Sequence, residues 1–155
     1  MLKTEIIDGI NRLMCTDNHC RYVHWNNPVP VVAALVMYNS QYIIARNANW
    51  PPGLFSLITG YLEHGETPEQ AAIREVSEEL GLTAQVSRYI GHYSFFEKNQ
   101  LLLCYEMQAT GTIKINHELA EIKILSHDEL HTYNFKPFYI TENIIKDWYH
   151  DAAKL

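Results

Sequence analysis

The chain has 155 residues, the length of one compact domain, and its proportions of apolar residues (47%) and charged residues (19%) are ordinary for a globular protein. Its formal net charge of -6 argues against a protein whose main task is to bind the phosphate backbone of a nucleic acid. That charge leaves phosphate chemistry open, because metal ions can invert the local charge of an acidic site.

The N-terminus and the cysteines bear on the cellular compartment. The first residues lack the long apolar stretch of a secretory signal peptide, and no run approaches the ~18 apolar residues of a membrane span. The three cysteines are an odd number for a disulfide framework. We therefore expect a reduced, cytoplasmic protein that does not enter a membrane.

Two regions differ in character. Residues 1–27 are interpreted as an N-terminal extension and residues 28–155 as the main domain. A proline-bounded stretch over residues 27–30 leads as extended chain into the first strand of that domain. The extension holds a group of residues that can bind metals, namely Cys15, His19, Cys20 and His24.

The strand patterns begin with a nearly continuous apolar run at residues 31–38, which predicts a strand buried on both faces. A short turn at Asn39 and Ser40 makes the next segment its hairpin partner. Residues 83–96 and 101–109 are expected to form a long antiparallel pair. The other expected strands are residues 41–46, 55–60 and 122–125.

The best helix pattern covers residues 67–80. Thr67 can cap it, Pro68 takes the first helical position, Gln70 completes a capping box, and Gly81 ends it. Its apolar face is expected to consist of Ala72, Ile73, Val76 and Leu80.

Two further helical patterns follow. Residues 126–130 resemble the start of a short capped helix, and residues 136–154 form a second amphipathic helix with its apolar side at Ile140, Ile144, Ile145 and Trp148. The order of strands, helix, strands and helix predicts an α/β (α+β) sandwich, in which helices pack on the faces of a mixed sheet.

Three carboxylates crowd one face of the first helix. Glu75, Glu78 and Glu79 stand at positions i, i+3 and i+4, so they repel one another and add no stability by themselves. Such clustered hard oxygen ligands suit Mg²⁺ or Mn²⁺. Arg74 can hold Glu78 by a charge-assisted bond, and Glu66 lies near the positive end of the helix dipole. The alternative is a solvated charged surface.

The register around these carboxylates decides between the two interpretations. It fits the pattern G-x5-E-x7-R-E-U-x-E-E-x-G-U, where U is a bulky apolar residue, and a chance match is on the order of one in ten million per chain. The stretch resembles the signature of the Nudix hydrolase family, and the order of elements extends the resemblance to most of residues 28–150. The matching positions are Gly60, Glu66, Arg74, Glu75, Val76, Glu78, Glu79, Gly81 and Leu82.

The resemblance implies a Nudix-type sandwich and assigns roles to residues. Glu75, Glu78 and Glu79 would be metal ligands for Mg²⁺ or Mn²⁺, joined by the carbonyl of Gly60. Arg74 and Glu66 would organise this catalytic site. The general base would be Glu78 or Glu121, and Glu118 competes with Glu121 for that role.

The resemblance also implies the reaction. The expected substrate is a small-molecule nucleotide, a nucleoside diphosphate linked to another group, such as ADP-ribose, FAD, NADH or a dinucleoside polyphosphate. Attack of water on the pyrophosphate bond would give a nucleoside monophosphate and a second phosphorylated fragment. Two alternatives stay open: a sensor with the Nudix fold that binds nucleotides without turnover, and a pyrophosphohydrolase of RNA ends or caps. A homodimer is also left open.

The flanking sequence bears on the substrate. Residues 56–67 resemble the NADH-pyrophosphatase branch of the family, with Tyr61 where that branch has Phe. The S-Q-P-W-P-F-P motif of the branch is missing from residues 92–100, so NADH specificity is not implied. The candidates for stacking on a base are Trp50, Tyr93, Phe95 and Phe96, with core packing as the alternative.

Residues 20–28 resemble the end of the zinc ribbon that precedes the domain in the same branch. A structural Zn²⁺ takes four ligands, and no second pair of cysteines follows. The set that remains for zinc is Cys15, His19, Cys20 and His24, and ordinary loop residues are the favoured alternative.

Overall fold

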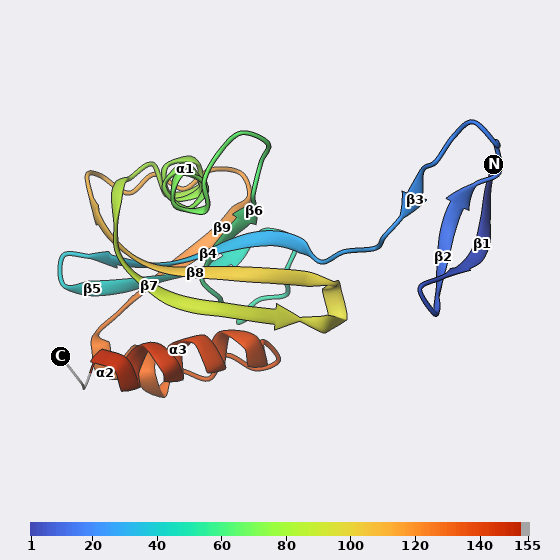
Figure 1. Ribbon diagram of the computed structural model, residues 1–155. Coiled ribbons are helices and arrows are strands. Elements are labelled where there is room, and N and C mark those ends of the chain that lie inside the picture. The colour runs from blue at the N-terminus through green and yellow to red at the C-terminus, as the bar shows by residue number, and fades with distance from the viewer. Residues whose placement is uncertain (153–155) are drawn as a thin grey trace.

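A mixed six-stranded sheet forms the centre of the computed structural model, which describes residues 1–152 (Figure 1). The strand order is β7-β8-β4-β5-β9, and β6 pairs with β4. The strands β4 and β8 run parallel, whereas the other pairs in the sheet are antiparallel. The strands are β4 (Val29–Tyr38), β5 (Gln41–Asn47), β6 (Ile58–Tyr61), β7 (Thr83–Phe95), β8 (Gln100–Thr110) and β9 (Leu119–Leu125).

Helices cover both faces of this sheet. Figure 1 shows α1 (Pro68–Leu80) above it, and α2 (His127–Thr132) and α3 (Tyr139–Ala152) below it. Alternate residues of β4 point to opposite faces of the sheet. Val32 therefore packs in the core between the sheet and α1, and Leu35 packs in the core between the sheet and α3. The predicted sandwich, and a first strand buried on both faces, are confirmed.

The hairpin turn at Asn39 and Ser40 is also confirmed. Both residues adopt a positive φ, 50° and 63°, as the tight two-residue hairpin turns of antiparallel strands require. The strand expected at residues 55–60 is shorter than predicted. It begins at Ile58, while Ser56 makes only an isolated bridge to Ala45.

The signals at the ends of α1 are confirmed. Thr67 Oγ1 accepts from the amide of Gln70 at 3.3 Å, and Gln70 Oε1 accepts from the amide of Thr67 at 2.8 Å. Gly81 ends the helix in the left-handed region, at a φ of 67°.

The expected apolar face of α1 is wrong at one position. Ile73 is 37% exposed, and Ala71 is fully buried instead. The buried face of α1 also contains Glu75 and Glu79. The face that packs on the sheet is therefore centred closer to these carboxylates than predicted, and Ile73 lies at its margin.

The last helix begins later than expected. It starts at Tyr139 instead of residue 136, because Pro137 disfavours a helical conformation for Lys136. Its expected end at Lys154 lies outside the described residues. The capped start at Ser126 is confirmed by a second capping box, with Glu129 as the partner. Within residues 1–152, every helix is too short or too polar to traverse a lipid bilayer.

The N-terminal extension forms a separate three-stranded sheet from β1 (Leu2–Ile7), β2 (Ile10–Cys15) and β3 (Val23–His24). Figure 1 shows this sheet apart from the main body, joined to it by extended chain. Sequence analysis does not predict these strands, although Asp8-Gly9 is a hairpin signal and both residues have positive φ.

Candidate active site

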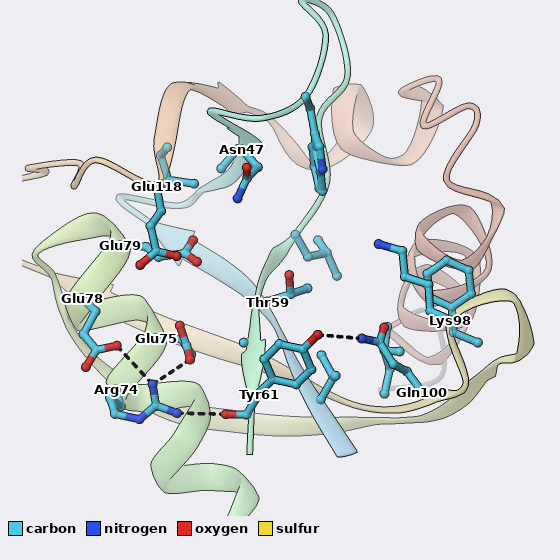
Figure 2. Close-up of a pocket in the computed structure, with 18 of the residues that line it drawn as sticks. Asn47, Thr59, Tyr61, Arg74, Glu75, Glu78, Glu79, Lys98, Gln100 and Glu118 are labelled. Atoms are coloured by element: carbon cyan, nitrogen blue, oxygen red, sulfur yellow. Dashed lines mark hydrogen bonds and ion pairs between the residues drawn. The ribbon is translucent and has the colours of Figure 1, made fainter. Parts of the chain in front are cut away.

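A pocket of about 460 Å³ lies beside α1 and β6, and its volume is typical of small-molecule sites. Figure 2 shows the carboxylates of Glu75, Glu78, Glu79 and Glu118 gathered along one side, and Lys98 and Gln100 on the opposite side.

The helix α1 supplies the carboxylates, and it buries two of them. Glu75 is 9% exposed and Glu79 is 5% exposed. The Glu79 carboxylate makes no hydrogen bond or ion pair with any residue in the 1–152 region. Burial, and then the nearby charges of Glu75, Glu118 and Glu78, raise its pKa to about 8. A buried carboxylate without a partner is costly unless a cation neutralises it.

Arg74 holds the neighbouring acidic groups together. Its guanidinium donates to Glu75 Oε1 at 2.6 Å, to Glu78 Oε2 at 3.1 Å and to Glu66 Oε1 at 2.8 Å. It also donates to the carbonyl oxygen of Tyr61 at 3.0 Å. These bonds, led by the one to Glu66, raise the pKa of Arg74 and keep it charged.

Glu66 fixes the loop between β6 and α1. Its carboxylate accepts from the Arg74 side chain and from the amide of Glu63, at 2.8 Å each, and both bonds lower its pKa, with the Arg74 bond the larger cause. Glu66 therefore anchors the loop to the helix without lining the pocket. The organising role expected of Arg74 and Glu66 agrees with these contacts.

Gly60 lies where β6 passes under α1. A Cβ atom at this position would overlap the carboxylate of Glu75, so glycine leaves that side chain room to lie against the strand. Gly60 lines the pocket together with Glu75, and its expected role as a carbonyl ligand of a metal stays a prediction.

Glu118 reaches the pocket because its segment is tied to the end of α1. The amide of Lys114 donates to the carbonyl of Leu80 at 2.8 Å, and the amide of Asn116 donates to the carbonyl of Glu79 at 3.1 Å. The amide of Glu118 is in turn held by Asn116 Oδ1 at 2.9 Å. The orphan carbonyls at the helix end are thereby satisfied, and Glu118 is brought to the pocket.

Glu121, the other candidate base, lies elsewhere. It is on β9 and accepts from Arg46 Nε at 2.7 Å. It does not belong to the described lining of the pocket, whereas Glu118 does. The structure thus brings Glu118, and not Glu121, together with the carboxylates of α1.

The donor set suits a hard divalent cation in its chemistry, because four carboxylates line one side of the pocket and the Glu79 side chain among them is buried. In the described conformation Glu75 and Glu78 are bound to Arg74. Across residues 1–152, no three His, Cys, Asp or Glu side chains are grouped closely enough to hold a metal. A cation held by these carboxylates would compete with Arg74 for Glu75 and Glu78.

The aromatic candidates are divided by the structure. Trp50 and Phe95 line the pocket, and the centroids of the Trp50 and Phe138 rings are 4.6 Å apart. Tyr93 does not line it: its hydroxyl donates to Asp147 at 2.8 Å, and its ring packs with the core under α3. Phe96 is 86% exposed and also lies outside the lining.

Residues 28–148 match the model of the NUDIX domain. The chain therefore belongs to the NUDIX family.

Curated relatives agree with this membership. The human mitochondrial NAD(P)H pyrophosphatase NUDT13 is 28% identical over 127 residues, which cover 79% of this chain and 36% of the relative. The NAD-capped RNA hydrolase NudC of Vibrio atlanticus (strain LGP32) is 31% identical over 103 residues, covering 66% of this chain and 38% of the relative. This chain thus spans well under half the length of either relative.

The fold is shared with a solved NUDIX hydrolase from Nitrosomonas europaea. That crystal structure matches at a TM-score of 0.83 and 20% identity, covering 99% of this chain and 88% of the other. At this identity the likeness concerns the fold alone, and it covers the N-terminal sheet as well as the NUDIX domain.

The candidate zinc residues lie in the N-terminal extension, away from the pocket of the NUDIX domain: Cys15 ends β2, His24 ends β3, and His19 and Cys20 lie in the loop between these strands. Cys15 and Cys20 are free and partly exposed, and the pKa of Cys15 is lowered by a hydrogen bond from the backbone of Asp17 and then by the Cys20 side chain. His19 is exposed and its amide donates to Asp17. His24 pairs with Leu13 between β2 and β3.

Several pocket residues of the NUDIX domain are not predicted from the sequence. Phe138 lies between Pro137 and α3, and Lys98 and Gln100 lie at the connection of β7 and β8. No local pattern marks them, because they reach the pocket only through the pairing of distant strands.

Proposed function

We propose that this chain is a metal-dependent hydrolase of the pyrophosphate bond in a nucleoside diphosphate linked to another group. The observation that carries the proposal is the buried, unpartnered Glu79 carboxylate among three further carboxylates at one side of a small-molecule pocket. Such a group is stabilised by a cation, and a phosphorylated substrate needs one there to overcome the acidic charge.

We assign separate roles to the glutamates of the pocket. Glu75, Glu78 and Glu79 would hold Mg²⁺ or Mn²⁺, aided by the carbonyl of Gly60. The bound cation would neutralise diphosphate charge and acidify the attacking water. Glu118 lies in the pocket without an ion pair among the described residues, and we assign it as the base that accepts the proton of that water.

The rest of the pocket serves to orient the substrate. Arg74 holds Glu66 and the loop in place through its bonds to Glu66 and the carbonyl of Tyr61, and Glu75 and Glu78 would be the residues that hold the cation. Trp50 and Phe95 offer aromatic surface for a base. The products would be a nucleoside monophosphate and a phosphorylated fragment.

The names of the relatives support a dinucleotide of the NAD type as substrate. One relative is named for NAD(P)H and the other for NAD-capped RNA, and both ligands contain a diphosphate between two nucleosides. The net charge of -6 favours the free dinucleotide over an RNA end. A cytoplasmic location remains part of the proposal, supported by the free state of the three cysteines.

The test is an activity panel. The chain is incubated with ADP-ribose, NADH, FAD and a dinucleoside polyphosphate in Mg²⁺, in Mn²⁺ or in EDTA, and the products are identified by mass spectrometry. We expect nucleoside monophosphate only in the presence of a divalent cation. Binding of these compounds without any product would favour a nucleotide sensor instead.

The variant Glu79→Gln tests the site itself. We expect it to keep the circular dichroism of the wild type and to lose turnover by on the order of a thousandfold. Asp128→Asn, which removes one exposed charge from α2, is the matched control and should retain full turnover. Wild-type turnover of Glu79→Gln would refute the site assignment.

A further inference from the structure

The pocket contains a cation on the side away from the glutamates. Lys98 ends the short 3₁₀ turn η1 (Phe96–Lys98), which joins β7 to β8, and its Nζ lies 5.7 Å from the centroid of the Phe95 ring. Figure 2 shows the ammonium group pointing into the pocket, across from Glu78 and Glu79.

Lys98 is available to a ligand in a way that Arg74 is not. Both are described lining residues, but the guanidinium of Arg74 is bound by Glu66, Glu75 and Glu78. Lys98 has no carboxylate partner within residues 1–152. Lys98 is exposed, and its ammonium group is therefore free to bind an anionic group of a ligand in the pocket.

The backbone around Lys98 is held in place. Asn99 adopts the left-handed conformation at a φ of 51°, and its amide donates to the carbonyl of Phe96 at 3.1 Å. Its carbonyl accepts from the amide of Val29 at 2.9 Å, and its side chain donates to Asn26. On the other side Gln100 Nε2 donates to Tyr61 Oη at 3.4 Å. The turn that presents Lys98 is thus fixed to β4 and β6.

Lys98 lies on the side of the pocket opposite the carboxylates of α1 (Figure 2). Under the proposed function, on which this inference rests, the diphosphate lies with the cation at the carboxylate side of the pocket. We therefore expect Lys98 to meet a second anionic group of the same ligand, on the far side of the pocket from the carboxylates.

We propose that Lys98 is a specificity-determining residue that binds a second phosphate of the substrate, a phosphomonoester remote from the scissile diphosphate. The chain then prefers diphosphate-linked nucleotides that carry this phosphate on a ribose over their counterparts without it. A phosphomonoester supplies close to two negative charges and three acceptor oxygens, which suits a lone ammonium group.

Two matched pairs of probes test the proposal. NADH and NADPH differ by a 2′-phosphate, and dephospho-coenzyme A and coenzyme A differ by a 3′-phosphate. We expect the wild type to favour the phosphorylated member of at least one pair by about tenfold in kcat/KM, mainly through KM. A preference in one pair identifies the position of the phosphate, and a preference in both assigns the subsite to any ribose phosphomonoester.

The variant Lys98→Gln separates a binding role from a general effect of charge. We expect its kcat/KM values for the two members of each pair to become nearly equal. Lys146→Gln, which removes one exposed charge from α3, should keep the preference of the wild type. A wild type without preference in either pair, or a Lys98→Gln variant that retains the preference, would overturn the proposal.

Failure of the proposed function is distinguishable from failure of this inference. If neither the members of the two pairs nor the compounds of the activity panel are hydrolysed with Mg²⁺ or Mn²⁺, the hydrolase proposal fails. Isothermal titration calorimetry on the wild type and Lys98→Gln then compares the dissociation constants within each pair. A tenfold difference that Lys98→Gln removes supports the phosphate subsite, and equal constants refute it.

Discussion

Glu118 and Glu121 are three residues apart, yet their surroundings differ completely. Glu118 lines the pocket, whereas Glu121 accepts from Arg46 on the neighbouring strand. We expect Glu118→Gln to lower kcat by about 10²- to 10⁴-fold, the usual contribution of a general base. Glu121→Gln should stay near the wild-type kcat, because it removes only an exposed ion pair. Saturating steady-state kinetics on both variants checks this, and loss of turnover in Glu121→Gln alone would reverse the assignment.

Gly60 is a second residue whose role follows from contact geometry. A methyl group there would overlap Glu75, so Gly60→Ala must displace that carboxylate or push β6 away from α1. We expect weaker binding of Mg²⁺, measured by calorimetry, together with a loss of turnover. Gly91→Ala on β7 is the control, because the nearest atom to its methyl would be the Tyr93 hydroxyl, at 3.3 Å, and the ring of Tyr93 would lie just beyond it. Equal Mg²⁺ affinity in Gly60→Ala and the wild type would contradict the close approach.

At the scale of single elements, α1 and α2 offer a matched pair of capping boxes. Thr67→Ala and Ser126→Ala should each cost about 1 kcal/mol in the free energy of unfolding. For a chain of this length the melting temperature falls by about 2–4 °C for each such loss. Ser126→Ala should leave turnover unchanged, because α2 lies on the face of the sheet opposite the pocket helix.

Thr67→Ala should also lower turnover severalfold, because Thr67 follows Glu66, which ties the loop to Arg74. Thermal denaturation and steady-state rates on both variants separate the two effects. Equal turnover in the two variants would show that the cap stabilises α1 without positioning the loop.

The capping signals explain why α1 could be predicted from the sequence. Thr67, Gln70 and Gly81 act through bonds within a few residues, so the local pattern contains the whole cause. The prediction for Ile73 is wrong because hydrophobicity alone does not reveal that Glu75 and Glu79 occupy the buried stripe. A buried carboxylate is rare in a structural helix, and here it accompanies the candidate metal site.

At the scale of the whole molecule, the pocket depends on contacts that no local pattern contains. The parallel pairing of β4 with β8 aligns Val29 with Gln100, and this brings the turn with Lys98 close to Tyr61, whose hydroxyl accepts from Gln100. The segment after β8 then returns to the end of α1 and carries Glu118 into the site. The carboxylates of α1 are therefore predictable from their spacing in the sequence, whereas the pocket residues on other strands and loops are not.

The N-terminal sheet and the NUDIX domain are expected to be separable parts of the chain. All described lining residues of the pocket lie between Val31 and Phe138. We expect residues 28–155 alone to fold and to keep cation-dependent turnover within about threefold of the full chain. Its melting temperature should fall by a few degrees, because the hydrogen bonds between Asn99 and Asn26 are lost.

Circular dichroism, activity and light scattering on both forms test this division. The N-terminal sheet exposes several large apolar side chains, among them Ile6 at 74% and Ile10 at 54%. If the full chain is a dimer and residues 28–155 are a monomer, this sheet carries the contact between two copies. Loss of turnover in a shortened chain that is still folded would contradict an independent NUDIX domain, because the extension would then contribute to the site.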